Sequence, residues 1–289
     1  MLSAWKRLPL IVRAILTGGI AAAVGTFTWS LLVQANLKIL PGVPWSIFPA
    51  SFFLWIFWRY LQGKGWPRST SEIRKTNLRA NRLSGDVWAS AIFAGILGLI
   101  ALLLFMRVMN RMIRLPQQEV ADLVSIPRIT LFFLLLMGSA VAGIVEEASF
   151  RGYMQGPIER RYGPVMAILI TGLLFGSAHF VHPETTVALM PFYLGVAAVY
   201  GMLAYITNSI LPGMILHAVG NVFGGIDLLT SGQSEWQAST KPMPLIWEKG
   251  TDSSFRVSCI IFIVFGIAAI WAYKALAAVV RKQWQESNE

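Results

Sequence analysis

Charged residues and cysteine are scarce in this sequence. Of its 289 residues only 13% are charged and 55% are apolar, and the mean hydropathy is +0.60. A soluble domain of this length carries about a quarter charged residues, so the composition excludes an ordinary water-soluble fold. The single cysteine, Cys259, excludes an intrachain disulfide and a cysteine-based zinc cluster. The sequence therefore predicts a polytopic membrane protein.

Several signatures of hydrolytic sites are also missing. The sequence contains no His-Glu-x-x-His zinc helix and no Gly-x-Ser-x-Gly elbow. It has no pair of intramembrane aspartates either, because Asp227 ends an apolar run without a second aspartate. Zinc-helix, serine-elbow and aspartate-pair chemistries are thereby excluded.

The apolar residues gather in runs long enough to cross the hydrocarbon core, which needs about 20 residues per helix. Such spans must be helical, because a segment in lipid has to satisfy its own backbone hydrogen bonds. We therefore predict an all-α fold in one integral membrane domain, residues 1–289, with about eight transmembrane helices enclosing a polar cavity. The first run exceeds a signal-peptide core and is expected to be retained. The spans lie near residues 10–33, 43–61, 86–106, 129–150, 164–181, 187–206, 210–226 and 255–280.

The net charge of +10 comes from basic residues clustered between these apolar runs. In that setting Lys and Arg are topology signals and contacts for anionic lipid headgroups, so we expect the lipid bilayer and no nucleic acid as a partner. With eight crossings most of them fall on one side, which makes both termini cytoplasmic. The basic residues on that side are Lys6, Arg7, Lys64, Arg68, Arg74, Lys75, Arg79, Arg82, Arg160, Arg161, Arg281 and Lys282.

One arginine-rich segment disagrees with this topology, because residues 107–128 would lie outside. Arg107, Arg111 and Arg114 share one helical face. We interpret them as the end of a helix that extends to the headgroups, with arginines that snorkel there. The alternative is a miscounted span upstream.

Three short polar motifs interrupt the apolar runs: Glu146-Glu147-x-x-x-Arg151, Phe175-x-x-x-His179 and His217-x-x-x-Asn221. Charged groups at membrane depth are costly and usually mark a functional interior. Residues four apart share a helical face, so each motif can present two side chains to one point. Taken singly, each pair could be a structural contact between helices. Together, on different spans, they favour a buried functional site.

These side chains supply the parts of an amide hydrolysis site. A glutamate assisted by histidine can deprotonate water, and histidine and asparagine can stabilise an oxyanion. One glutamate can be held by Arg151 while the other faces a cavity. One glutamate with two histidines could instead bind zinc, so a metal-dependent form stays open. Small residues in the stretches 138–143 and 220–225 are expected to let helices approach closely around these groups.

The order and spacing of the three motifs resemble those of the CPBP intramembrane peptidases, which include CAAX prenyl endopeptidases and bacteriocin-processing or self-immunity proteins. The similarity covers about residues 129–226. It implies an intramembrane endopeptidase in which Glu146 and His179 activate water. The family has been argued to be either metal-dependent or glutamate-dependent; the residues favour the glutamate form with no cofactor, because an asparagine and a second histidine already supply electrophilic assistance. His217 and Asn221 would form the oxyanion hole, and the supporting residues would be Glu147, Arg151 and Phe175.

The resemblance also leads to expectations about the membrane in which the protein lies and about its substrate. The short loops are typical of a bacterial member, so we expect the bacterial cytoplasmic membrane and a membrane-associated peptide or protein substrate, with or without a lipid group. Two other functions fit a polar membrane site: a non-catalytic immunity or scaffold protein, and a proton-relaying transporter. The first half of the chain repeats none of the motifs, which gives no support to an inverted-repeat transporter.

Overall fold

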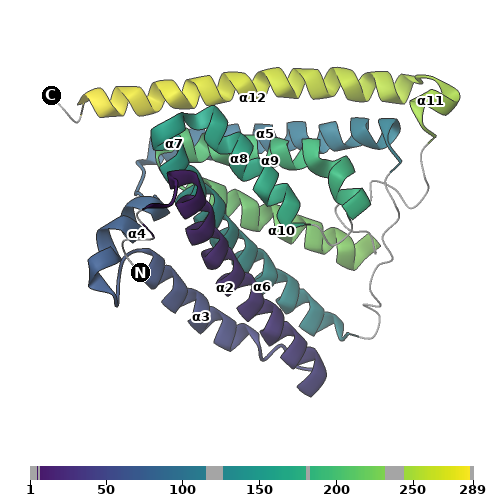
Figure 1. Cartoon of the computed structure of the whole chain (residues 1–289). Coiled ribbons are helices and arrows are strands. Elements are labelled where there is room, and N and C mark those ends of the chain that lie inside the picture. The colour runs from purple at the N-terminus through teal and green to yellow at the C-terminus, as the bar shows by residue number, and fades with distance from the viewer. Residues whose placement is uncertain (1–4, 6, 115–125, 180–182, 232–243, 287–289) are drawn as a thin grey trace. The chain divides into compact units, whose positions relative to one another are not determined.

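The computed structural model describes residues 5, 7–114, 126–179, 183–231 and 244–286 (Figure 1). Within these ranges the chain forms helices and connecting turns and no β-strand, which confirms the all-α prediction.

The helices coincide with the predicted spans. Among the described residues, five helices are long and apolar enough to cross a membrane, and three further apolar helices are shorter. The chain is thus an integral, polytopic membrane protein. The five are α2 (Leu10–Ile39), α5 (Gly85–Met112), the continuous helix Arg128–Tyr162, Val187–Thr207 within α9 (Pro183–Thr207), and α12 (Ser253–Glu286). The three shorter ones are α3 (Ile47–Leu61), α8 (Pro164–Ala178) and Leu211–Ile226 within α10 (Leu211–Ser231).

The chain divides into two compact units, which we describe separately. Unit 1 comprises Met1–Ala80, Glu119–Ala167 and Gly213–Glu235, and unit 2 comprises Asn81–Gln118, Ile168–Pro212 and Trp236–Glu289. The single integral membrane domain over residues 1–289 stays a prediction.

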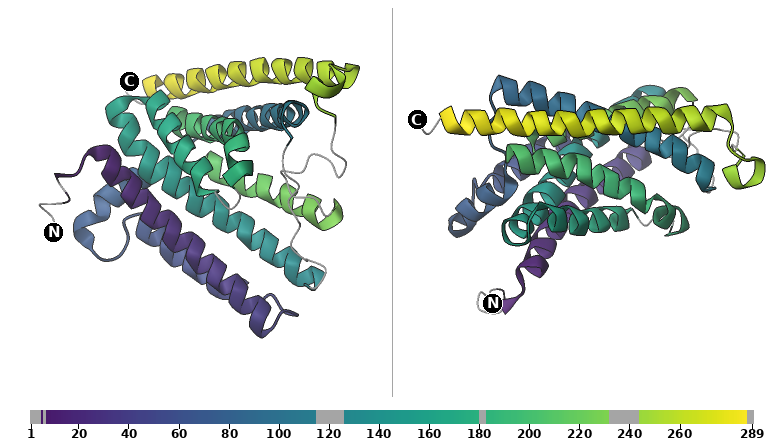
Figure 2. Two further views of the ribbon diagram at one scale, coloured as in Figure 1. Left: turned by 45° about the vertical axis from the view of Figure 1, so that its right-hand side comes forward. Right: turned by 90° about the horizontal axis from the view of Figure 1, so that it is seen from above.

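In unit 1, α2 and α3 pack beside α6 (Arg128–Glu146), as the left view of Figure 2 shows. Glycines on α2 permit this approach. A Cβ at Gly18 would lie 2.7 Å from the carbonyl oxygen of Ser149, and one at Gly25 would lie 2.4 Å from the side chain of Val145. Small residues of this kind allow membrane helices to approach closely, and here they bring α2 against the glutamate motif.

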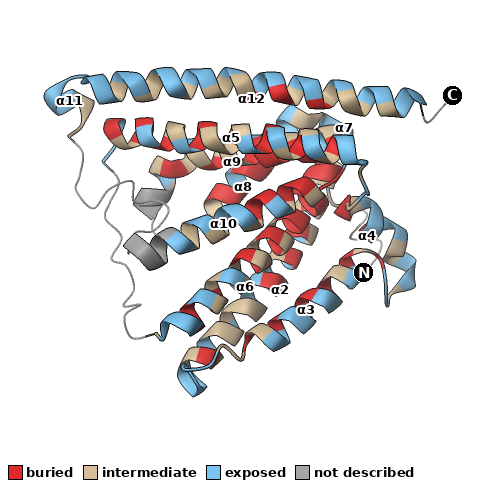
Figure 3. Cartoon of the chain, turned by 180° about the vertical axis from the view of Figure 1, so that it is seen from behind, coloured by how far each residue is buried: buried red, intermediate tan, exposed pale blue. Residues whose placement is uncertain are grey.

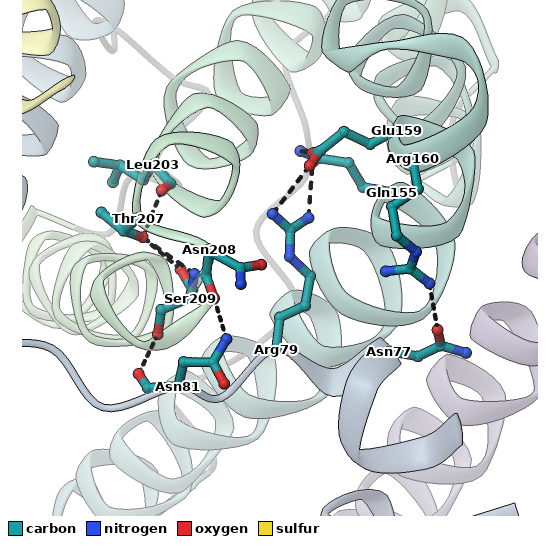
Figure 4. A network of polar contacts seen from close by, with 10 residues as sticks. All are labelled: Asn77, Arg79, Asn81, Gln155, Glu159, Arg160, Leu203, Thr207, Asn208 and Ser209. Carbon is teal, nitrogen blue, oxygen red and sulfur yellow. Dashed lines mark hydrogen bonds and ion pairs between the residues drawn. The ribbon is translucent and has the colours of Figure 1, made fainter. Parts of the chain in front are cut away.

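Hydrogen bonds and an ion pair connect the short helix α4 (Ser71–Leu78) and the residue after it to α7 (Gly156–Tyr162) in unit 1. Arg79 donates to both carboxylate oxygens of Glu159, at 3.2 and 3.1 Å, and Gln155 donates to Glu159 at 3.0 Å (Figure 4). Arg160 donates to the Asn77 side chain at 2.9 Å. Two of the arginines interpreted as topology signals therefore also hold this unit together.

In unit 2, α5 packs against both α9 and α12. A Cβ at Gly195 would lie 2.4 Å from the Leu102 side chain, so α5 and α9 are in close contact. The Tyr273 hydroxyl of α12 donates to the carbonyl of Val199 at 2.8 Å. Figure 4 also shows the polar turn after α9, where the Asn81 amide donates to the carbonyl of Asn208 at 2.6 Å.

At the arginine-rich end of α5, Arg111 differs from its prediction, whereas Arg107 and Arg114 are exposed. Arg111 is only 3% exposed, so its side chain packs inside the protein and does not snorkel. Its guanidinium donates to the carbonyl of Pro244 at 2.9 Å and to Asp252 at 2.8 Å. Arg114 pairs with Glu248 at 2.6 Å. Arg111 and Arg114 therefore bind the segment 244–252, which includes α11 (Ile246–Lys249), to the end of α5.

This contact is expected to depend on pH. The hydrogen bond from Arg111 holds the pKa of Asp252 below its usual value of 3.8. A depressed pKa contributes stability that is present above the unfolded-state value and is lost as the pH falls through the folded-state value. The protection of residues 244–252 against hydrogen exchange, taken as the observed rate relative to the intrinsic rate at each pH, should therefore fall as the pH drops below about 4. Asp252→Asn should already lack this protection at neutral pH, and a wild-type protection that stays constant down to about pH 2 would contradict the role of Asp252.

Candidate functional site

The glutamate motif lies at the end of α6, in unit 1. The Arg151 guanidinium is 3.3 Å from Glu147 Oε1, and the two side chains are 1% and 0% exposed. This confirms the predicted pairing of residues four apart. The side chain of Glu146 is 24% exposed. The two adjacent carboxylates therefore occupy different environments: that of Glu147 is fully buried and ion-paired, and that of Glu146 is partly exposed.

The motif itself is not α-helical. Glu147–Gln155 forms a π-helix between α6 and α7, and all nine residues are buried (Figure 3). A π-helical segment is rare and is frequently found at functional sites. Pro157, in the first turn of α7, has no N–H to donate to the preceding turn. This loss is one local reason for the wider hydrogen-bonding pattern before it.

His217 on α10 contacts both glutamates. Its Nδ1 lies 3.0 Å from Glu147 Oε1, and its Nε2 lies 3.7 Å from Glu146 Oε2. A carboxylate oxygen accepts, so the Nδ1–H donates to Glu147. Glu147 Oε1 thus forms an ion pair with Arg151 and accepts a hydrogen bond from His217. Two motifs that are 70 residues apart in the sequence meet in one buried cluster.

Gly143 explains how α6 and α10 come close enough for this contact. A Cβ at Gly143 would lie 2.8 Å from the carbonyl oxygen of Met214 and 2.9 Å from the Cβ of Ala218. Gly143 stands one turn before Glu147, and Ala218 follows His217. The predicted role of the small-residue stretches is confirmed at this position. Gly220, by contrast, faces open space.

Gly143→Ala is expected to separate the two helices. The added methyl group meets a backbone carbonyl that cannot rotate away, so the variant should lose about 1–3 kcal/mol of stability and most of the activity that depends on Glu147 and His217. Gly220→Ala is the matched control, because it adds the same methyl group where nothing lies within 4 Å. Thermal unfolding and activity of both variants test this. Equal behaviour of the two would show that the close approach is unimportant.

Asn221 is half-buried on α10, four residues after His217, so it shares the face of the helix that carries the histidine. Unit 1 therefore holds five of the seven predicted site residues: Glu146, Glu147, Arg151, His217 and Asn221.

The remaining two, Phe175 and His179, lie on and just after α8 in unit 2. His179 Nδ1 is 2.8 Å from the carbonyl oxygen of Phe175. A carbonyl only accepts, so Nδ1 carries the hydrogen and Nε2 carries the lone pair when the ring is neutral. The imidazole also stacks on Tyr193 of α9, with ring centroids 4.8 Å apart.

Sequence reasoning missed three features of these sites: the π-helix, the contact of His217 with Glu147, and Tyr193. Helical spacing reports only on neighbours within one helix, so it could not pair side chains on α6 and α10. The one available signal was Gly143, four residues before Glu147 and within a stretch of small residues.

The side chains available as ligands in unit 1 can be compared with what a catalytic zinc ion needs. A catalytic zinc site uses three protein ligands. In unit 1, Glu147 is already bound to Arg151 and His217, which leaves Glu146 and His217 Nε2 as candidates. Among the residues that the structure describes, no group of three or more His, Cys, Asp or Glu side chains is arranged to hold a metal ion.

The comparison with known families agrees with the motifs. Residues 128–223 match the family described as type II CAAX prenyl endopeptidase, Rce1-like. No curated protein and no solved structure matches the chain. The matched segment begins with α6 and ends two residues after Asn221, so it contains all three motifs. The chain is an integral membrane protein that carries, over residues 128–223, an Rce1-like domain of the CPBP intramembrane protease family.

Proposed function

We propose that this protease is an endopeptidase that hydrolyses a peptide bond of a membrane-associated protein or peptide with a water molecule activated by Glu146. The observation that carries the proposal is the cluster in which His217 bridges the two glutamates. Such a set of ionisable groups inside an apolar helix bundle is expensive to bury and is usually retained for function.

Glu146 is the better general base of the two carboxylates. Glu147 is fully buried and holds both Arg151 and His217. Glu146 is partly exposed, so a water molecule and a substrate carbonyl can reach it. A general base must lie within hydrogen-bond reach of the proton that it removes, and only Glu146 meets that requirement.

The reaction then balances as an ordinary hydrolysis. Glu146 accepts a proton from water, and the water oxygen attacks the carbonyl carbon. Asn221 donates hydrogen bonds to the developing oxyanion. When the C–N bond breaks, the leaving nitrogen takes the proton from Glu146. Glu147 acts as the orienting carboxylate for His217, in the manner of the aspartate in a serine protease triad.

The bond to Glu147 also fixes how His217 takes part. Because Nδ1 already donates to Glu147, Nε2 donates to an oxyanion only when the ring carries its second proton. The cluster contains the two carboxylates of Glu146 and Glu147 and the single guanidinium of Arg151, which together carry one net negative charge. A positively charged imidazolium at His217 makes the cluster neutral. We therefore assign His217 to the oxyanion hole in its charged form, beside Asn221.

We assign His179 to the same water on the basis of the family's motif pattern. Its Nδ1–H donates to the Phe175 carbonyl, and this supports a basic Nε2. The proposal needs no metal, because His217 and Asn221 already supply electrophilic assistance. Were zinc bound, it would supply Lewis-acid polarisation of water, with Glu146, His217 and His179 as the candidate ligands.

The substrate class follows the family description. Its CAAX prenyl specificity favours a peptide with a lipidated C-terminal tail, and a bacterial source would favour a small membrane-associated peptide instead. To decide, purified protein in liposomes would be given lipidated and unlipidated peptides, and products would be identified by mass spectrometry. Cleavage by wild type, absent in Glu146→Ala and His179→Ala, supports the proposal. A cellular phenotype that survives both substitutions would instead support a non-catalytic immunity or scaffold role.

A further inference from the structure

The imidazole of His179 is enclosed by two aromatic rings within unit 2. The ring of Tyr193 stacks on it with an interplanar angle of 27° and a centroid distance of 4.8 Å. The ring of Phe175 lies at the same centroid distance but is tilted by 59°. Phe175 and Tyr193 also contact each other edge to face at 5.9 Å. The three rings form one cluster, of which the family motif contains only two.

The fold brings Tyr193 to this position through glycines on α8. A Cβ at Gly176 would lie 3.2 Å from the Cβ of Tyr193, and one at Gly172 would lie 2.8 Å from the Cβ of Ala197. These contacts place the glycine faces of α8 directly against the Cβ atoms of α9, so a side chain from α9 reaches a residue at the end of α8. Tyr193 is 4% exposed, so its ring is held by its surroundings.

Two restraints together fix the imidazole. The hydrogen bond from Nδ1 to the Phe175 carbonyl selects the tautomer. One hydrogen bond alone leaves the ring free to turn, because the torsion that rotates a histidine ring has broad minima. The flat contact with Tyr193 fixes the plane of the ring and hence the direction of the Nε2 lone pair.

We propose that Tyr193 is the positioning residue of His179: its ring face holds the imidazole in the plane that aims Nε2 at the reacting water. This inference rests on the proposed function for its catalytic consequence, although the ring geometry stands by itself. The face of the ring makes the contact, so phenylalanine should replace tyrosine and an unbranched aliphatic side chain should not.

The kinetic test compares Tyr193→Phe and Tyr193→Met, with full-length protein in liposomes and a peptide that wild type cleaves. Misplacement of a catalytic group by about 1 Å costs on the order of 10²-fold, so the Met variant should lose about that factor in kcat and little in KM. The Phe variant should stay close to wild type. Tyr200→Met is the matched control, because Tyr200 is an equally buried tyrosine on α9.

A second readout does not need activity. The chain has only three histidines, so ¹⁵N-histidine spectra can resolve the tautomer of each ring. Wild type and Tyr193→Phe should show His179 protonated at Nδ1, and Tyr193→Met should show a mixture. Loss of kcat in the Phe variant, or an unchanged tautomer and kcat in the Met variant, would overturn the proposal. Should Glu146→Gln prove fully active, the proposed function fails while the spectra still decide the role of Tyr193.

Discussion

Glu147→Leu is expected to destabilise the protein by about 3–5 kcal/mol, the usual effect of removing one partner of a buried ion pair. Arg151, 1% exposed, would keep its charge without the carboxylate that now faces it. The same substitution removes the acceptor of the His217 Nδ1–H. Activity should fall by roughly 10²- to 10³-fold, the usual effect of losing one oxyanion-hole donor, because His217 is then no longer oriented.

The double variant Glu147→Leu/Arg151→Met separates the two effects. Replacing a whole buried ion pair by apolar side chains is often neutral or stabilising, so the second substitution should restore the part of the stability that the unpaired Arg151 charge removes. About 1–3 kcal/mol should remain lost, since the His217 donor still lacks its acceptor. Activity should not return. Thermal unfolding and peptide cleavage of the three proteins test this, and a double variant as active as wild type would show that Glu147 has no part in orienting His217.

Glu146→Gln is expected to lower kcat/KM by about 10²- to 10⁴-fold, the contribution of a general base. Glutamine has nearly the same shape, but its amide accepts no proton from water. Because the Glu146 side chain is partly exposed and lies 3.7 Å from its nearest charged partner, the melting temperature should stay within about 2 °C of wild type. The opposite pattern, a large loss of stability with activity retained, would make Glu146 a structural residue.

Glu72→Gln serves as the control for this substitution. Glu72 is an exposed glutamate in the first turn of α4, so the variant removes one carboxylate from unit 1 without touching the cluster. Both its melting temperature and its activity should match wild type. A similar loss of activity in both variants would point to a general effect of charge.

The helices were predictable because hydropathy reports directly on burial in lipid. Spans such as 86–106 and 129–150 contain long apolar runs, and the structure places α5 and the helix Arg128–Tyr162 there. Helical spacing likewise predicted the pair of Glu147 and Arg151. Both properties belong to one segment at a time, which is the information that a single sequence carries.

The remaining features depend on contacts between segments or on the balance of competing hydrogen bonds. The π-helix follows from packing and backbone satisfaction around Pro157, for which residue periodicity gives no signal. The arginines at the end of α5 were interpreted from their spacing alone, but Arg111 binds a carbonyl group 133 residues away and a carboxylate 141 residues away. Tyr193 carries no motif and becomes notable only beside His179.

The most direct test of the central claim is the rate of peptide hydrolysis by wild-type protein in liposomes after exhaustive treatment with a strong chelator. A water molecule activated by Glu146, with His217 and Asn221 as the electrophilic groups, predicts an unchanged rate, and the rate should still disappear in Glu146→Gln. Loss of hydrolysis on chelation that added zinc restores would contradict the account. Glu146 and the two histidines would then be ligands of a metal ion.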